Sequence, residues 1–168
     1  MVIKYVGKLS LKYKIYNMIT IEDFKIKHSN KVRFIGLDLG SKRIGVSICD
    51  ERQSIATPYK TINKTNTNNL IVELQKIIKE NKIRGIIVGN PINMDGSMGR
   101  STQSVNDIAS NISKSIDLPV ILWDERLSTV GAFNLSSQLD VNVSKRVKTI
   151  DQNAAAFILQ GAIDFLNN

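Results

Sequence analysis

The sequence predicts an α/β fold in which helices cover a mixed five-stranded sheet, with three antiparallel strands followed by two parallel ones. The first half of the pattern joins apolar runs of strand length by short turns, and the second half alternates such runs with segments of helical period. A hairpin-type start followed by this alternation is typical of a mixed sheet. The chain of 168 residues, 42% of them apolar and 23% charged, suits one domain with a single core.

The first three strands are expected to form the antiparallel part. Val32–Leu39 and Arg43–Cys49 are apolar runs joined by the turn Gly40-Ser41-Lys42, a pattern typical of a β-hairpin. Ser54–Ile62 is the expected third strand. Because Pro58 cannot donate a hydrogen bond to a neighbouring strand, we expect this strand at the edge of the sheet.

The rest of the chain is expected to alternate helices and strands. Apolar residues recur every three or four positions over 67–80, which predicts a helix, and Asn66 or Thr67 can cap its start. The elements expected after it are strand Ile83–Val88, loop Gly89–Arg100, helix Ser101–Ile116, strand Pro119–Trp123, helix Ser128–Gln138, a basic loop, and a last helix over about Asp151–Leu166.

Residues 1–31 are predicted to be a basic extension, partly flexible or weakly helical, ahead of a domain at 32–168. Seven lysines against Glu22 and Asp23 give this extension +5 of the net charge of +8. The charge of the remaining chain is therefore only modest support for an anionic partner. No apolar run approaches the ~18 residues of a membrane span, no secretion signal is recognised, and a single cysteine fits a reducing compartment. We expect a cytoplasmic protein without membrane association.

Carboxylates stand at the ends of two apolar strands and at the start of the last helix. Asp38 ends the first strand, the pair Asp124-Glu125 follows another, and Asp151 begins the helix. Asp151 shares a helical face with the apolar residues 155, 158, 162 and 165, so it should point toward the sheet, whereas Asp164 lies off that face. Since sites in such sheets form at the carboxyl ends of strands, these carboxylates are predicted to converge.

Converging carboxylates repel one another, and a divalent cation relieves that repulsion. Two Mg²⁺ or Mn²⁺ ions could activate a water molecule and stabilise the leaving oxygen of a phosphodiester. The candidate metal ligands are Asp38, Asp151 and either Asp124 or Glu125. Alternation along a strand allows only one of the pair to face the site, and we favour Glu125.

Simpler interpretations exist for each carboxylate taken alone. Asp38 could start a turn, Asp151 could be an N-cap, and Asp124-Glu125-Arg126 could be an exposed loop with a local ion pair. Their joint occurrence in suitable elements favours the metal site. The only histidine, His28, lies in the extension, which disfavours a mechanism that depends on histidine.

Several basic and polar residues are candidates for contact with the substrate. Neither a dinucleotide-binding glycine motif nor a P-loop is present. The loop at 89–100 adjoins the strand ends, and cations can contact phosphates. The candidates are Lys42, Arg43, Asn93, Arg126 and Lys148, together with Arg100.

Four ordered motifs resemble one known family. They are Asp38-Leu39-Gly40-Ser41-Lys42-Arg43-Ile44-Gly45-Val46, Val88-Gly89-Asn90-Pro91-Ile92-Asn93-Met94-Asp95-Gly96, Asp124-Glu125-Arg126-Leu127-Ser128-Thr129, and Asp151 with Ala154-Ala155-Ala156. From about Arg33 to its C-terminus the chain closely resembles the YqgF family, whose members are called Holliday-junction-resolvase-like proteins or pre-16S rRNA nucleases. It departs from the family at Asn90, where an apolar residue is usual.

The resemblance implies a ribonuclease-H-like fold and a cytoplasmic hydrolase of phosphodiester bonds that matures the 5′ end of 16S ribosomal RNA. It also implies that Asp38, one of Asp124 and Glu125, and Asp151 form a catalytic, metal-binding set. Cleavage of branched DNA is an alternative that uses the same chemistry. A third hypothesis is that the protein binds nucleic acid without cleaving it. We expect a monomer or a weak homodimer.

Overall fold

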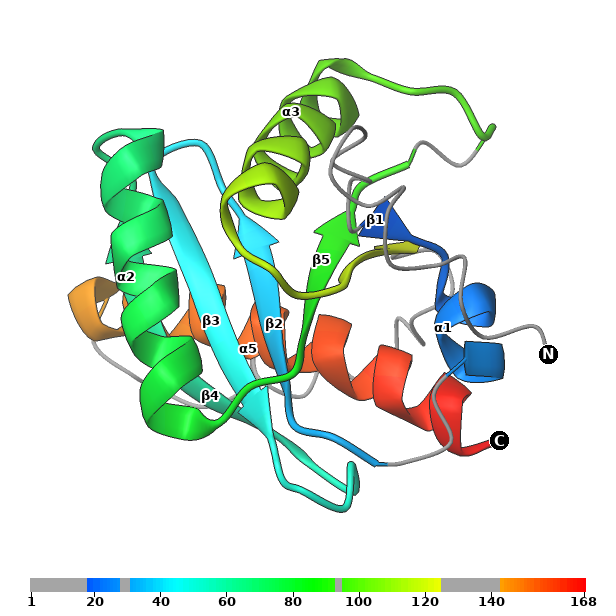
Figure 1. Cartoon of the computed structure of the whole chain (residues 1–168). Coiled ribbons are helices and arrows are strands. Elements are labelled where there is room, and N and C mark those ends of the chain that lie inside the picture. Colours follow the sequence, from blue (N-terminus) through cyan, green and yellow to red (C-terminus); the bar gives the residue numbers. More distant parts are fainter. Residues whose placement is uncertain (1–17, 28–30, 93–94, 125–142) are drawn as a thin grey trace, which may run out of the picture.

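The computed structural model describes residues 18–27, 31–92, 95–124 and 143–168, with the side chains of Lys27 and of residues 143–150 excepted. A single sheet of six strands forms its centre, in the order β1-β6-β5-β2-β3-β4 (Figure 1). The strands are β1 (Met18–Ile19), β2 (Phe34–Leu39), β3 (Arg43–Cys49), β4 (Ala56–Asn63), β5 (Gly85–Asn90) and β6 (Val120–Asp124). The helices are α1 (Ile21–Lys27), α2 (Thr67–Asn81), α3 (Arg100–Ser115) and α5 (Val143–Asn167).

The antiparallel part of the sheet agrees with the prediction. β2 pairs antiparallel with β3, and β3 pairs antiparallel with β4, which forms one edge of the sheet. Pro58 lies in that edge strand, where a missing N–H donor leaves no gap in the sheet. The register shifts between Val46 and Ser47, so a bulge interrupts the β3–β4 pairing.

The parallel part also follows the predicted alternation of helix and strand. β5 runs parallel to β2 on one side and to β6 on the other, with α2 and α3 as the intervening helices. Asn66 caps α2, because its side-chain oxygen accepts a hydrogen bond of 2.8 Å from the backbone N–H of Asn69. The carboxyl ends of β2, β5 and β6 therefore meet at one edge of the sheet.

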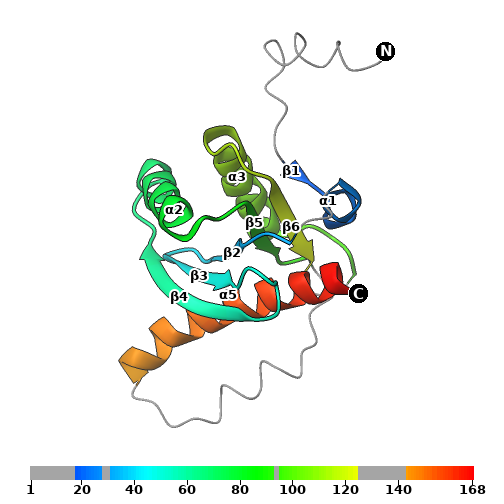
Figure 2. The same ribbon diagram turned by 60° about the horizontal axis from the view of Figure 1, so that its bottom comes forward.

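The two faces of the sheet are covered differently, as Figure 2 shows. α2 and α3 lie side by side over one face, whereas α5 crosses the other and α1 packs near the C-terminal end of α5. The first face buries a continuous aliphatic cluster that includes Ile35, Leu37, Ile44, Leu74 and Ile112. The α5 face buries a second cluster that includes Phe34, Ile121, Trp123, Leu159 and Ile163. Side chains alternate between the two faces along each strand.

Residues 18–27 belong to the sheet and its core, which corrects the expected five strands to six. β1 pairs parallel with β6, and the ring of Phe24 on α1 packs edge-on against Phe34, with 5.2 Å between their centroids. Both Ile21 and Phe24 are buried. The prediction missed this segment because a two-residue strand and a seven-residue helix are too short to show a period.

The last helix begins earlier than predicted, at Val143 instead of Asp151. Asp151 therefore lies two turns inside α5 and does not cap it. The basic run Lys145–Lys148, expected in a loop, belongs to the same helix. The predicted helix Ser128–Gln138 lies outside the described residues. Within the described part of the chain, no helix is both long and apolar enough to cross a membrane.

Candidate active site

Asp38 and Asp151 occupy the α5 face of the sheet, near the carboxyl end of the central strand β2. Asp38 pairs across the hairpin with Gly45, so both residues point to the same face. α5 also comes very close to Gly45, because a Cβ added there would overlap the backbone carbonyl of Asp151. The strand and the helix thus bring the two predicted carboxylates to one place.

Small residues on β2 and β3 allow this close approach. A Cβ built on Gly36 would lie 2.6 Å from Cβ of Leu159 and 3.0 Å from the carbonyl oxygen of Ala155, too close for any side chain. Ser47, which pairs with Gly36, donates a hydrogen bond of 2.8 Å to the same Ala155 oxygen. The backbone of α5 therefore packs directly against three small residues of the sheet, Gly36, Gly45 and Ser47.

Arg43 pairs with one of the two carboxylates on this face. Its Nε donates to Oδ2 of Asp151 at 2.7 Å, and the two side chains are 38% and 22% exposed. Burial, and then the negative charge of Asp151, raise the pKa of Asp38 above its ordinary value. Among the described residues, no cation or hydrogen-bond donor contacts the Asp38 carboxylate. The site thus holds two neighbouring carboxylates and one cation that is bound to only one of them.

The third predicted carboxylate is not among these residues. Asp124 ends β6 and follows Leu122, which packs with the α2–α3 cluster, whereas Trp123 packs with the α5 cluster. By strand alternation, Asp124 lies on the face opposite Asp38. Glu125 lies outside the described residues. Within the described ranges, no three acidic, histidine or cysteine side chains gather closely enough to hold a metal ion by themselves.

The donor chemistry nevertheless fits a hard divalent cation. Mg²⁺ binds through one or two carboxylates and keeps several waters, so two neighbouring aspartates provide suitable ligands. Burial, and then the charge of Asp151, raise the pKa of Asp38, and a bound cation would offset both effects by stabilising the carboxylate. Asp38 and Asp151 are the described residues that could hold it.

The predicted substrate contacts are only partly described. Lys42 is exposed in the β2–β3 turn, and its carbonyl accepts a hydrogen bond of 2.9 Å from the N–H of Lys64, at the end of β4. Arg100 is exposed at the first position of α3. Asn93 and Arg126 lie outside the described residues, and so does the side chain of Lys148.

Two features of the site escaped the sequence prediction. The roles of Gly36 and Gly45 could have been suspected, because glycine inside a strand often marks close backbone approach. The pairing of Arg43 with Asp151 could not, because 108 positions separate them. No spacing rule relates residues so far apart in the chain.

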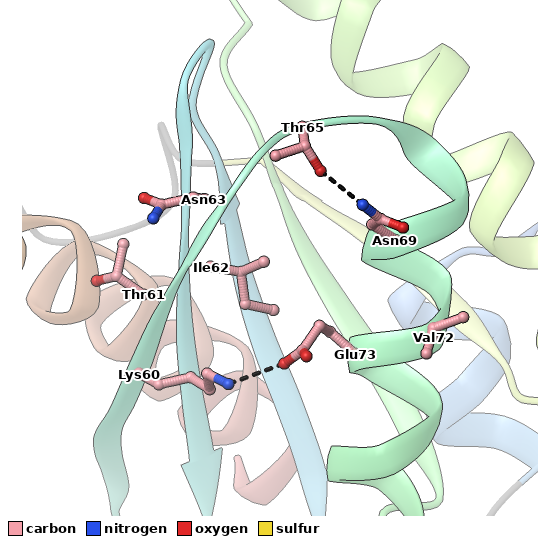
Figure 3. A pocket seen from close by; sticks show the side chains of 8 residues that line it. All are labelled: Lys60, Thr61, Ile62, Asn63, Thr65, Asn69, Val72 and Glu73. Carbon is pink, nitrogen blue, oxygen red and sulfur yellow. Dashed lines mark hydrogen bonds and ion pairs between the residues drawn. The ribbon is translucent and has the colours of Figure 1, made fainter.

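Two surface cavities lie away from Asp38 and Asp151. One, of about 340 Å³, opens between β4 and α2, where Lys60 and Glu73 form an ion pair of 2.9 Å across it (Figure 3). That ion pair holds the pKa of the Glu73 carboxyl below its ordinary value. The other, of about 530 Å³, lies where β1 and α1 meet β6, and Asp124 is among its lining residues.

Comparisons with known proteins agree on a family and on the fold. A family model described as "RuvX: Holliday junction resolvase" matches residues 32–165. A protein of Pelagibacter ubique, strain HTCC1062, is 91% identical over 90% of this chain and all of its own length. One of Rhodobacter capsulatus is 41% identical over 87% of this chain and 92% of its own length. Both are named "Putative pre-16S rRNA nuclease".

Two solved structures share the fold at low sequence identity. Thermus thermophilus RuvC in complex with a Holliday junction substrate superimposes with a TM-score of 0.53 at 9% identity, covering 79% of this chain and 93% of that one. The yeast mitochondrial Holliday junction resolvase gives 0.51 at 13% identity, covering 88% and 84%. The predicted ribonuclease-H-like fold is confirmed.

Proposed function

We propose a function from the premise that this chain belongs to the RuvX family of YqgF-type, Holliday-junction-resolvase-like proteins. In this proposal the protein is a divalent-metal-dependent nuclease that processes the 5′ end of pre-16S ribosomal RNA. The names of its close relatives support the activity and the substrate. The observation that carries the chemistry is the pair Asp38 and Asp151, held together by the close contact of α5 with the β2–β3 hairpin.

Asp38 and Asp151, with Glu125 as the third ligand, would hold Mg²⁺ or Mn²⁺, and we favour two ions. Bound there, the metal supplies an activated water and charge stabilisation for the leaving oxygen of the phosphodiester. Glu125 is favoured over Asp124 because Asp124 belongs to the opposite face of β6.

The surrounding residues bind and orient the substrate. Lys42 is exposed in the β2–β3 turn, and it and Arg43 are suited to contact a phosphate. Arg126, Lys148 and Asn93 are kept as substrate-contacting residues on the sequence pattern alone. The ion pair with Arg43 fixes the side-chain orientation of Asp151. The partial burial of Asp38 strengthens its interaction with any cation that binds there.

Substitution of single carboxylates tests this proposal. We expect Asp38→Asn and Asp151→Asn each to slow cleavage of a precursor 16S RNA fragment in Mg²⁺ or Mn²⁺ by roughly a thousandfold, because each removes a metal ligand. Asp164→Asn is the matched control, since Asp164 is on the same helix but exposed, bonded to Gln160. Unchanged cleavage by Asp38→Asn would refute the proposal.

Cleavage of branched DNA is a second candidate, favoured by the description of the matched family and by the shared fold of two resolvases. The reaction and the carboxylates would be the same, and only the substrate would differ. Incubating one preparation with four-way junction DNA and with precursor RNA, under a single metal condition, separates the two. Faster cleavage of the junction would favour the second candidate.

We also propose that the protein is cytoplasmic and acts as a monomer or a weak homodimer, with residues 32–168 as the nuclease domain. The match of the family model to residues 32–165 supports this domain. Residues 18–27, which the sequence analysis assigned to the basic extension, form β1 and α1 and pack against this domain. Sedimentation at several concentrations tests the oligomeric state, and a stable tetramer would contradict it.

A further inference from the structure

We propose that Arg43 is an exchangeable counter-ion, which neutralises Asp151 while the metal is absent and moves to a phosphate of the substrate when the metal binds. The inference rests on the proposed function and extends it. It makes binding of the metal and binding of the nucleic acid depend on each other through one side chain.

The first observation is the position of the Arg43 guanidinium. It bonds Oδ2 of Asp151 at 2.7 Å, so it lies where a cation held by that carboxylate would lie. This pair includes the least exposed carboxylate of the described ion pairs, at 22%, against 75% for Glu51 and 42% for Glu73. Partial burial strengthens both the attraction of Arg43 to Asp151 and its repulsion of an incoming metal ion.

The second observation is how Arg43 is bonded. Only its Nε contacts Asp151, and its two terminal nitrogens have no partner among the described residues. Arginine binds phosphate through such nitrogens in a planar, two-pronged geometry. The side chain is 38% exposed, so the group can reach a ligand from solvent.

The third observation is the uneven charge balance of the site. Asp38 has no cationic partner among the described residues, whereas the neighbouring Asp151 is paired with Arg43. A divalent cation shared by both carboxylates already balances their two negative charges. If Arg43 stayed as well, the site would carry an excess positive charge. The guanidinium is then the group that leaves, and a phosphate anion at the site gives it a new partner.

The test measures Mn²⁺ binding without nucleic acid, by calorimetry at neutral pH. We expect Arg43→Gln to bind Mn²⁺ about tenfold more tightly than the unsubstituted protein, because a competing positive charge is removed. Arg43→Met, which keeps an apolar stem of similar length, should behave in the same way and serves if Arg43→Gln does not fold. Arg43→Lys keeps the charge and should stay near the original affinity.

Lys60→Gln is the matched control. It also removes one positive charge and one ion pair of 2.9 Å, but on the α2 side of β4 (Figure 3). Its Mn²⁺ affinity should equal that of the unsubstituted protein. A tighter affinity in Lys60→Gln would show that net charge alone is responsible, and would overturn the proposal.

A second measurement tests the movement to phosphate. Anisotropy of a labelled single-stranded precursor RNA should show that Ca²⁺, used in place of Mg²⁺, strengthens RNA binding by the unsubstituted protein. In Arg43→Gln that strengthening should shrink severalfold. Equal strengthening in both proteins would overturn the exchange.

The outcomes separate this inference from the proposed function. If the unsubstituted protein binds no Mn²⁺, or binds it equally after Asp38→Asn, the metal site itself is wrong. If Mn²⁺ binding depends on Asp38 but is unchanged or weaker in Arg43→Gln, the site stands and Arg43 merely orients Asp151.

Discussion

The two faces of the sheet are built from different residues and hold their helices in different ways. On the α2–α3 face, branched aliphatic side chains such as Ile35, Leu37 and Ile44 separate the helices from the strands. On the α5 face, next to the proposed active site, the same two strands present Asp38 and three small residues, Gly36, Gly45 and Ser47, and the helix backbone rests directly on these three. One hairpin thus serves a packing face and a functional face.

This difference separates the residues that contribute most to stability from those proposed to carry the activity. Large side chains bury more apolar area and stabilise the fold, but they keep a helix at a distance. Small side chains contribute little burial and let two carboxylates from distant segments approach each other. The α5 face therefore contributes less hydrophobic stabilisation than the α2–α3 face. It also contains the repulsion between Asp38 and Asp151.

The largest effect on stability is expected on the aliphatic face. Leu74→Ala should lower the free energy of unfolding by about 3 kcal/mol, since Leu74 is fully buried and its truncation leaves a cavity. Cleavage per folded molecule should be unchanged, because α5 is not in this layer. Urea denaturation with activity assays below the transition checks both, with Val72→Ala, 63% exposed on the same helix, as control. A large loss of cleavage by folded Leu74→Ala would contradict the proposal that the α2–α3 face contributes to stability alone.

A substitution on the α5 face is expected to lower the free energy of unfolding by less, but to remove metal binding. Gly45→Ala should cost about 2 kcal/mol, because the new methyl group overlaps the Asp151 carbonyl and displaces α5. The stabilisation of the folded protein by Mn²⁺ should disappear with it, which thermal denaturation with and without the ion measures. Ile44→Val, the neighbouring position on the aliphatic face, should keep that stabilisation. Retention of it in Gly45→Ala would mean that close approach is not required.

Removal of one hydrogen bond between β3 and α5 should have a more modest effect. Ser47→Ala is expected to cost about 1 kcal/mol, because the hydroxyl that bonds the Ala155 carbonyl is lost. Mn²⁺ affinity should fall only slightly, since Gly36 and Gly45 still admit the helix. Ser104→Ala, exposed on α3, is the comparison for denaturation, and an equal effect in both would show that the bond contributes nothing.

The smallest expected effect is a dependence of stability on pH in the metal-free protein. Because the folded-state pKa of Asp38 is raised, the folded state binds more protons than the unfolded state between the ordinary pKa of 3.8 and the raised one. The free energy of unfolding should therefore fall as pH rises through this window and then level off. Asp38→Asn should reduce the fall, as urea titrations in chelator can show. An unaltered pH profile would exclude Asp38 as its source.

The antiparallel strands and the two covering helices could be predicted because their signals are local. Alternation, the turn at Gly40, and Pro58 at an edge each depend on a few adjacent residues. The placement of Asp151 toward the sheet was also predictable, since helical period alone sets which residues share its face.

Other features depend on contacts that no local pattern contains. β1 exists because Met18 and Ile19 pair with β6, not because two residues favour a strand. The early start of α5 was hidden by a run of lysine and arginine that resembles a loop. The ion pair of Arg43 with Asp151 is visible only after folding, and the choice of Glu125 over Asp124 stays a prediction.

The 108 positions between Arg43 and Asp151 also set the order in which the protein is made. Ribosomes add about 5–20 residues per second, so roughly 5–20 s separate synthesis of the hairpin from synthesis of the residue that completes its site. During that interval the nascent chain carries Asp38 on a strand whose helix is still missing. If Asp151 is a metal ligand, as proposed, the nuclease is inactive until this residue has been synthesised and α5 has docked on the hairpin.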